Sequence, residues 1–246
     1  MIERDTELQT TSEPAIAYST CYRLPFLSLF HADCMEIMKQ YPDKYFDLAI
    51  VDPPYGLQAT GNLSRMNGAG KLKNRAINKF NCDFDLELPS AEYFSELFRV
   101  SKNQIIWGGN YFDLPPTRGV ICWDKVQPWE NFSAWEMAWT SFDKPASLFK
   151  FDNRTGDKIH PTQKPVALYE WLLSKYAKAG DTILDTHIGS GSIAIACQTL
   201  GYSLTGCELN KSYFQSSVKR IEANAQQASL FETEQPKQEQ MTLEGA

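Results

Sequence analysis

The chain has 246 residues, 43% of them hydrophobic and 22% charged, with a net charge of −6. This length and composition support a complete hydrophobic core, and no apolar stretch approaches the ~20 residues that a membrane-spanning helix needs. The six cysteines form no CxxC pair and the three histidines are scattered, so we expect no metal site, no membrane contact and a cytoplasmic protein with reduced thiols.

The most informative segment is an apolar run, Phe46–Val51, that predicts a buried strand and ends in Asp52-Pro53-Pro54-Tyr55. The Asp52 carboxylate can accept a hydrogen bond from an amino group, and the carbonyl of Pro53 is a second acceptor in a backbone that two prolines restrain. Tyr55 adds an aromatic face, on which a base can stack with about 1–3 kcal/mol. These features indicate a pocket for the exocyclic amine of adenine or cytosine. The alternative is a strand that ends in a rigid turn.

Residues 56–82 follow as a segment rich in glycine, asparagine and basic residues. Between positions 56 and 81 it carries five positive charges and no acidic residue, so the rest of the chain has a net charge of −11. A basic loop next to the predicted base pocket would bind a polyanion such as DNA, although a solvated surface loop explains the charge equally well. The predicted DNA-binding residues are Arg65, Lys71, Lys73, Arg75 and Lys79.

Two features occupy the middle of the chain. Aromatic residues at 123, 129, 135, 139 and 142 alternate enough to favour a strand core over contact with a base. His160-Pro161-Thr162-Gln163-Lys164-Pro165 then leads into a predicted helix at 166–178. Lys164 and the free N–H groups at the start of that helix would suit a carboxylate, unless the segment is an ordinary loop.

The last third of the chain predicts half of a nucleotide-binding unit. A strand at 181–185 runs into the turn Gly189-Ser190-Gly191, a helix that ends at 200, and a second strand at 202–207 that ends in Glu208. The glycines allow a ligand to approach the backbone, and Glu208 can accept both hydroxyls of a ribose. The turn lacks a third glycine and the lysine of a phosphate loop, which favours an adenosyl group over a dinucleotide or a triphosphate.

With these three segments in this order, residues 29–225 resemble the β class of amino-group DNA methyltransferases, and residues 30–35 resemble the family's adenine-binding strand. The resemblance implies an α/β, Rossmann-like methyltransferase fold with permuted motif order, in which helices flank a mostly parallel sheet. It also implies S-adenosylmethionine as methyl donor, a flipped base in DNA as acceptor, and a bacterial or phage-type enzyme of the restriction-modification kind.

The family's site residues carry over to positions in this chain. The predicted catalytic residues are Asp52, Pro53, Pro54 and Tyr55: Asp52 and the Pro53 carbonyl would bind the target amine, and Tyr55 would stack on the base. The predicted cofactor-binding residues are Asp33 and Cys34 for the adenine, Glu208 for the ribose, Asp185, Gly189, Ser190 and Gly191 for the methionine part, and Thr162 and Lys164 for the carboxylate.

The chain departs from the family pattern at two positions, which puts its affinity for the cofactor in question. His187 stands where the family usually has Phe, and Ser192 where it usually has Thr. Asp52 favours adenine N6, because the family's cytosine-N4 members usually carry Ser there. Methylation of cytosine N4, methylation of RNA and a catalytically silent DNA-binding homologue are the alternatives.

We expect an N-terminal extension at 1–28, one catalytic domain at 29–227 and a disordered tail at 228–246. No separate target-recognition region stands before position 160, so recognition would fall to the basic loop and to residues 125–132, with a short or loosely read target site. The residues from Gln227 to Phe231 resemble the peptide with which bacterial replication proteins bind the sliding clamp, or else they fasten the last helix. Related enzymes are often dimers, which leaves a homodimer open.

Overall fold

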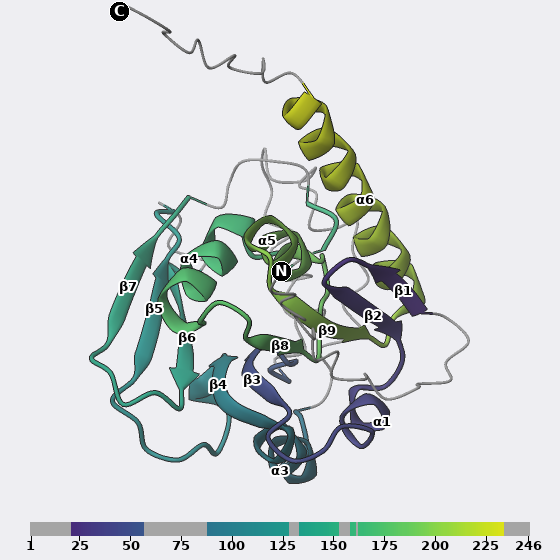
Figure 1. The fold of residues 1–246 in the computed structure, drawn as a ribbon. Helices are drawn as coiled ribbons and strands as arrows, with labels where there is room; N and C mark the ends of the chain where they lie inside the picture. Colours follow the sequence, from purple (N-terminus) through teal and green to yellow (C-terminus); the bar gives the residue numbers. More distant parts are fainter. Residues whose placement is uncertain (1–20, 57–87, 128–132, 153–157, 161, 234–246) are drawn as a thin grey trace, which may run out of the picture.

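A computed structural model describes residues 21–56, 88–127, 133–152, 158–160 and 162–233 of the chain (Figure 1). The predicted basic loop, with Arg65, Lys71, Lys73, Arg75 and Lys79, lies outside the described residues, as do positions 234–246. Within the described part of the chain, no helix combines the length and the apolar composition that crossing a bilayer requires.

The core of the fold is a nine-stranded sheet with the order β1-β2-β9-β8-β3-β4-β6-β5-β7. The strands are β1 Cys21–Leu24, β2 Leu27–His31, β3 Phe46–Val51, β4 Ser101–Trp107, β5 Val120–Asp124, β6 Trp135–Thr140, β7 Ser147–Lys150, β8 Thr182–Asp185 and β9 Ser203–Glu208. The five adjacent strands β2, β9, β8, β3 and β4 are all parallel, whereas β1 and β6 pair antiparallel with their neighbours. This arrangement confirms the predicted α/β fold with a mostly parallel sheet.

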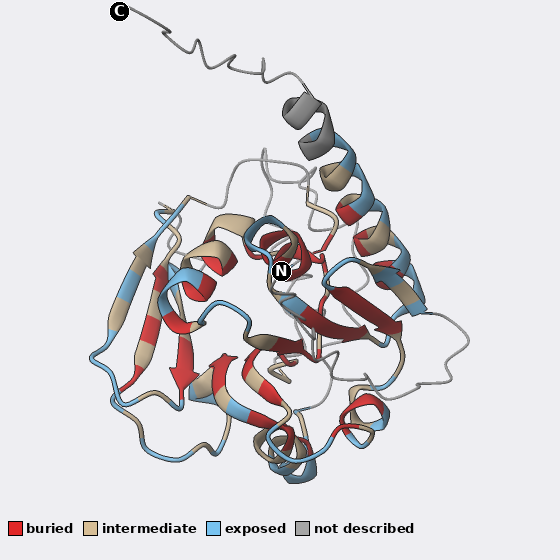
Figure 2. Cartoon of the chain, in the orientation of Figure 1, coloured by how far each residue is buried: buried red, intermediate tan, exposed pale blue. Residues whose placement is uncertain are grey.

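Helices cover both faces of the sheet. They are α1 Cys34–Met38, α3 Ala91–Val100, α4 Val166–Tyr176, α5 Ser192–Leu200 and α6 Lys211–Thr233, with a short 3-10 helix, η4, at Gly109–Tyr111. Figure 1 shows α4, α5 and α6 on one side of the sheet, with α1 and α3 on the other. Along β3, Leu48 and Ile50 pack in the cluster with α4 and α5, while Ala49 and Val51 pack in the cluster with α1 and α3. The central strands are therefore buried on both faces (Figure 2), which is why β3 has a continuous apolar run.

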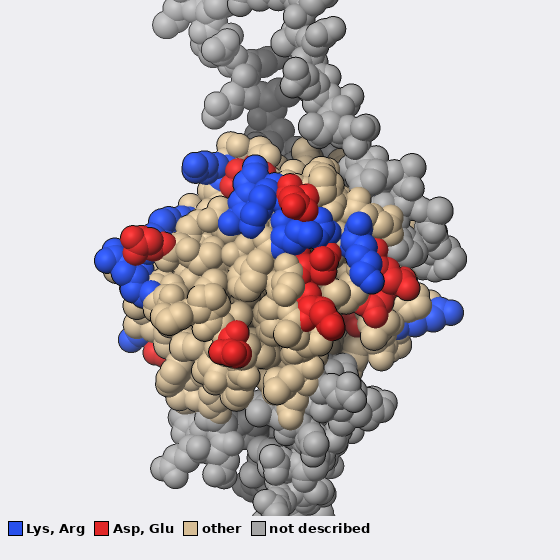
Figure 3. Space-filling model, turned by 90° about the horizontal axis from the view of Figure 1, so that it is seen from below, with Lys and Arg blue, Asp and Glu red and all other residues tan. Residues whose placement is uncertain are grey.

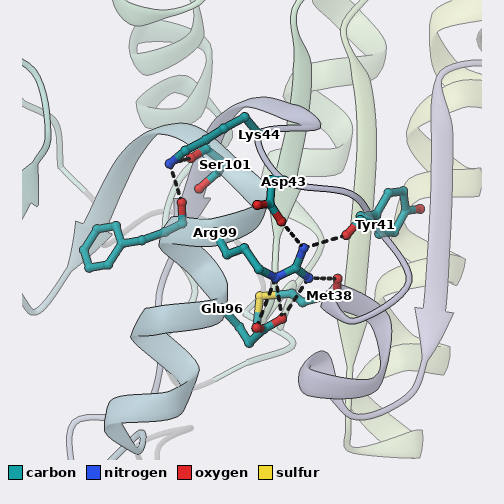
Figure 4. A network of polar contacts seen from close by, with 8 residues as sticks. Met38, Tyr41, Asp43, Lys44, Glu96, Arg99 and Ser101 are labelled. Carbon is teal, nitrogen blue, oxygen red and sulfur yellow. Dashed lines mark hydrogen bonds and ion pairs between the residues drawn. The ribbon is translucent and has the colours of Figure 1, made fainter.

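Arg99, near the end of α3, holds the segment between α1 and β3 in place (Figure 4). Its guanidinium donates to the carbonyl oxygens of Met38 at 3.0 Å and Tyr41 at 2.9 Å. It also pairs with the carboxylates of Asp43 at 2.8 Å and Glu96 at 2.9 Å. These contacts fix the entry to β3, the strand that leads to the predicted base pocket.

The structure differs from the predicted boundaries at both ends of the domain. β1 pairs with β2 over Cys21–Leu24, so the sheet starts before the predicted domain start at 29. Helix α6 continues to Thr233, so the predicted start of the tail at 228 falls inside a helix. Both misses have a local cause: β1 is a short, half-exposed strand at the sheet edge, and residues 227–233 contain neither Gly nor Pro to end the helix.

The aromatic segment behaves largely as predicted. Trp123 and Trp139 are 1% and 8% exposed and lie in the hydrophobic core, which confirms the interpretation of core packing for these two residues. Trp135 is 52% exposed. Position 129 lies outside the described residues.

Candidate active site

A cavity of about 670 Å³ opens at the carboxyl ends of the parallel strands. Asp33 follows β2, Asp52 follows β3 and Glu208 ends β9, and all three line the cavity, as does Lys164 from the segment before α4. Because parallel strands end at the same edge of a sheet, residues far apart in the sequence meet there, which is where ligands bind in open α/β sheets.

Asp52 is held through both of its carboxylate oxygens. The Tyr55 hydroxyl donates to Oδ1 at 2.5 Å, and the Lys164 ammonium donates to Oδ2 at 2.5 Å. The side chain of Asp52 is 15% exposed and that of Lys164 only 2%. Burial raises the pKa of Tyr55 well above its ordinary value, and the charge of Asp52 raises it further, so the phenol stays protonated and acts as a donor.

Lys164 lies against the predicted catalytic centre and lines the cavity; its contact with the cofactor carboxylate stays a prediction. Its Nζ is 3.1 Å from Glu136 Oε2 of β6 as well as 2.5 Å from Asp52, and it lies 5.1 Å from the centre of the Trp107 ring. Burial lowers the pKa of Lys164, but the nearby charges of Asp52 and Glu136 outweigh this and raise it. The buried ammonium is therefore charged and already neutralised by carboxylates of the protein.

The position of the Tyr55 ring is restricted by a turn that the sequence analysis did not identify. Gly108 follows β4 in the left-handed conformation, with φ of 70°, and a Cβ there would lie 2.2 Å from Tyr55 Cε1. Tyr111, at the end of η4, stacks on Tyr55 with ring centres 5.0 Å apart and is 42% exposed. The signal that could have found this turn is the pair Gly108-Gly109 directly after a buried apolar strand.

The opposite part of the cavity has the features of an adenosyl site. Glu208 accepts hydrogen bonds from the backbone N–H of Gly189 at 3.1 Å and of Asn210 at 2.9 Å. Gly189 has φ of 48°, so the turn brings backbone rather than side chain to the cavity. Asp33 caps α1 by accepting from the Met35 N–H at 2.8 Å, and Cys34 lines the wall beside it. Two carboxylates at neighbouring strand ends, next to a glycine turn that lines the cavity, fit the hydroxyls and amine of an adenosyl group.

Two of the predicted cofactor residues do not line the cavity. Asp185 is 2% exposed and lies behind the turn, where it accepts from the His187 N–H at 2.9 Å. Burial raises the pKa of Asp185 to about 8. Gly191 starts α5, and a Cβ there would lie 3.2 Å from Ser217 and 3.1 Å from Ile221 of α6. These two residues shape the turn from behind.

The two departures from the family pattern both have partners. His187 lines the cavity, and its Nδ1 lies 2.9 Å from Thr186 Oγ1. Burial lowers the pKa of His187 to about 4, so the ring is neutral at physiological pH and can replace a phenyl ring. Ser192 donates to the Lys164 carbonyl at 2.7 Å, which ties α5 to the catalytic centre.

Thr162 and Ser190 complete the predicted set. Both line the cavity, and Thr162 Oγ1 lies 3.1 Å from His160 Nδ1. His160 is 7% exposed, and burial lowers its pKa to about 4.

Residues 122–219 match a protein-family model described as DNA methylase, of the N6 and N4 type. Among curated proteins, the type II methyltransferase M.HinfI of Haemophilus influenzae is 26% identical over 244 residues, which cover 79% of this chain and 68% of that protein. The type II methyltransferase M.HpaI of Haemophilus parainfluenzae is 34% identical over 83 residues, which cover 32% of this chain and 26% of that protein.

Solved structures share the fold at lower identity. The complex of M1.HpyAVI with SAM has a TM-score of 0.55 at 23% identity and covers 79% of this chain and 99% of its own. The cytosine-N4-specific PvuII DNA methyltransferase has a TM-score of 0.54 at 14% identity and covers 82% and 92%. Both likenesses concern the Rossmann-like fold.

Proposed function

We propose that this chain, a DNA methyltransferase of the N6/N4 amino-methylase family, transfers a methyl group from S-adenosylmethionine to N6 of an adenine flipped out of DNA. The observation that carries the proposal is the Asp52 carboxylate at the end of β3, clamped by Tyr55 and Lys164 beside the adenosyl-binding part of the cavity. The fold does not choose between acceptor atoms, because a cytosine-N4-specific enzyme shares it. The choice of adenine rests on Asp, rather than Ser, at position 52.

In this proposal the chain's own residues bind and orient the amine. Asp52 and the carbonyl of Pro53 accept hydrogen bonds from the two N–H groups, which turns the nitrogen lone pair toward the cofactor site. Tyr55 stacks on the base and keeps Asp52 in place through its hydroxyl. Bound S-adenosylmethionine supplies an electrophilic methyl group on a sulfonium. The methylated nitrogen must then lose a proton, and the Asp52 carboxylate, already hydrogen-bonded to it, is the group placed to take that proton.

Binding of the DNA backbone is assigned to the basic loop at 56–82. The face of the molecule in Figure 3 carries Lys and Arg side chains intermixed with Asp and Glu along one edge, beside a wide uncharged area. Such a mixed surface produces no uniform positive field to attract a polyanion. In this proposal the five basic residues of the loop bind the phosphate groups, and changing them to Gln should reduce the salt dependence of DNA binding.

Two further partners remain proposals. Helix α6 extends past the sheet to Thr233 (Figure 1), and its last turns contain the clamp-like segment, whose first residue, Gln227, is exposed. Capture of this protein by purified sliding clamp that is unaffected by changing Leu230 and Phe231 to Ala would refute clamp binding through this segment. A single monomeric mass in solution, with and without DNA, would refute a homodimer.

The reaction is tested by incubating the protein with unmethylated genomic DNA and S-adenosylmethionine, followed by mass spectrometry of the nucleosides. We expect N6-methyladenine, and we expect Asp52→Ala to lower the rate by at least ~10²-fold, because it removes an acceptor that binds the reacting amine in the transition state. Asp143→Ala is the control, since that side chain is 88% exposed.

Three other results would each contradict a part of this proposal. N4-methylcytosine alone would refute the choice of adenine and keep the mechanism. A product formed equally fast by Asp52→Ala would refute the assigned site. DNA without any methylation would refute DNA methyltransferase activity in favour of an RNA substrate or a silent DNA-binding protein.

A further inference from the structure

The catalytic centre contains a buried ammonium shared by two carboxylates from different strands. Lys164 is 2% exposed, and its Nζ lies 2.5 Å from Asp52 at the end of β3 and 3.1 Å from Glu136 in β6. A buried charge is tolerated only when it is paired, so both carboxylates contribute to holding this cation. Glu136 itself does not line the cavity, so it acts on the site only through Lys164.

Glu136 is fixed in the sheet and has one oxygen directed at Lys164. Its Oε1 pairs with Lys125 on the outer side, and its Oε2 is buried. Among the described residues, Oε2 takes part in no hydrogen bond, and its ion pair with Lys164 is the close contact it has. Burial alone would raise the pKa of Glu136, but the charges of Lys164 and Lys125 outweigh it and lower the pKa to about 2. Glu136 is therefore ionised, and its Oε2 can accept a hydrogen bond from Lys164.

The hydrogen bonds of Asp52 explain why the Lys164 ammonium needs a second carboxylate. Tyr55 occupies Oδ1 and Lys164 occupies Oδ2. Each oxygen keeps a second lone pair for the target amine, but the charge of the carboxylate is then shared among three donors and holds Lys164 less strongly. A buried ammonium that loses its carboxylate is strongly disfavoured unless a second one takes over.

We propose that Glu136 is a positioning residue that holds Lys164 beside Asp52 and takes over its charge when Asp52 engages the amine. This inference rests on the proposed function, since it assigns a role within the same reaction. Glu136 would raise kcat without touching the base or the cofactor.

The test is a double-mutant cycle on kcat with Glu136→Gln, Lys164→Met and the two combined, each measured against both substrates. We expect E136Q to lower kcat on the order of 10²-fold, the effect of a small misplacement of a catalytic group, with KM for S-adenosylmethionine unchanged. Because Glu136 acts through Lys164, the double variant should lose no more kcat than K164M alone. Losses that multiply would overturn the inference.

The pH dependence gives a readout that a structural role would not change. Glu136 is one of the charges that raise the pKa of Lys164, and it raises the pKa of Tyr55 as well, so its removal lowers both. The alkaline limb of the kcat profile should therefore move to lower pH in E136Q. A profile that superimposes on that of the wild type would contradict the proposal.

Asp124→Asn is the matched control, because it removes the same charge from the neighbouring strand β5. Asp124 pairs with the exposed Lys150 at 3.8 Å and accepts from the Val126 N–H, a bond that Asn preserves. We expect wild-type kcat from D124N. If E136Q does not fold, Glu136→Asp serves instead, because it keeps the charge but draws it back from Lys164; wild-type kcat in that variant would overturn the inference.

The activity of the wild-type protein distinguishes a failure of the role assigned to Glu136 from a failure of the proposed function. A wild type that methylates DNA together with an equally active E136Q overturns the role of Glu136 alone. A wild type without activity on DNA overturns the proposed function and this inference with it.

Discussion

Replacing Gly108 by Ala should displace the Tyr55 ring, and this tests whether the position of Tyr55 matters for the reaction. Gly108 has φ of 70°, and a Cβ built on it lies 2.2 Å from Cε1, 2.6 Å from Cδ1 and 2.7 Å from Cζ of the Tyr55 ring. Ordinary contacts between carbon atoms are about 3.5–4.0 Å, so the ring has to move by more than about 1 Å. The Tyr55 hydroxyl donates to Asp52 at 2.5 Å, and this bond cannot survive such a shift unchanged.

The substitution should lower both the unfolding free energy and the rate of methyl transfer. A left-handed non-glycine residue costs about 1–2 kcal/mol, and overpacking adds typically 1–3 kcal/mol, so G108A should lose about 2–5 kcal/mol of unfolding free energy. A displacement of about 1 Å at a catalytic group can lower the rate on the order of 10²-fold. Cofactor affinity should be unchanged, because Gly108 does not line the cavity.

The control is Gly201→Ala, and the assays are methyl transfer to DNA, calorimetric cofactor binding and urea unfolding. Gly201 has φ of 74°, and a Cβ there meets nothing within 4 Å, so G201A has the backbone strain without the collision. We expect G201A to lose stability alone. If G108A and G201A lose the same stability and both keep wild-type kcat, then the position of Tyr55 does not matter for the reaction and its assigned role is refuted.

Three further predictions concern single side chains. Arg99→Ala should lower the unfolding free energy by about 2–3 kcal/mol in urea titrations, because it removes several charge-assisted bonds (Figure 4), while kcat stays unchanged. A loss below about 0.5 kcal/mol, which is the noise of such titrations, would contradict this. His187→Phe should remove about 3 kcal/mol of acid destabilisation. His187 is neutral in the fold down to its pKa of about 4, while the unfolded chain binds a proton below about 6.5, so wild-type stability falls as the pH drops over that interval. Equal slopes of stability against pH in both proteins would exclude the effect. Glu208→Ala should weaken cofactor binding by about 10- to 100-fold in calorimetry, since it removes the predicted ribose acceptor and the acceptor of the Gly189 N–H. Unchanged affinity would contradict the proposed adenosyl site.

Elements with a strong local signal could be predicted from the sequence. β3 runs over Phe46–Val51 as expected, because a parallel strand buried on both faces requires a continuous apolar run. Helix α4 begins at Val166 as expected, directly after Pro165, whose restricted φ suits the start of a helix. The Gly-rich turn and Glu208 could be predicted together, since the distance between them follows from one strand-helix-strand unit.

The network around Lys164 could not be predicted, because its members share no local pattern. Lys164 and Asp52 are 112 positions apart, and they meet only because the loop before α4 passes the end of β3. Glu136 lies in a segment whose aromatic residues indicated a strand core, and nothing in the spacing showed that one polar residue of that strand faces inward. The sheet order, which places β6 next to β4, determines this contact.

The contacts of Lys164 also explain why residue 52 is Asp rather than Ser. Asp52 is one of two carboxylates that neutralise the buried Lys164, so a neutral Ser at this position would leave the ammonium to Glu136 alone. Leaving a buried cation with one partner fewer is unfavourable, so an Asp at 52 and a Lys at 164 depend on each other. Asp52→Ser should therefore cost stability as well as activity, and Asp52→Ser combined with Lys164→Met should recover stability but no methyl transfer. If the single D52S variant is as stable as the wild type, Lys164 does not depend on Asp52 for its charge, and the electrostatic argument for the whole centre fails.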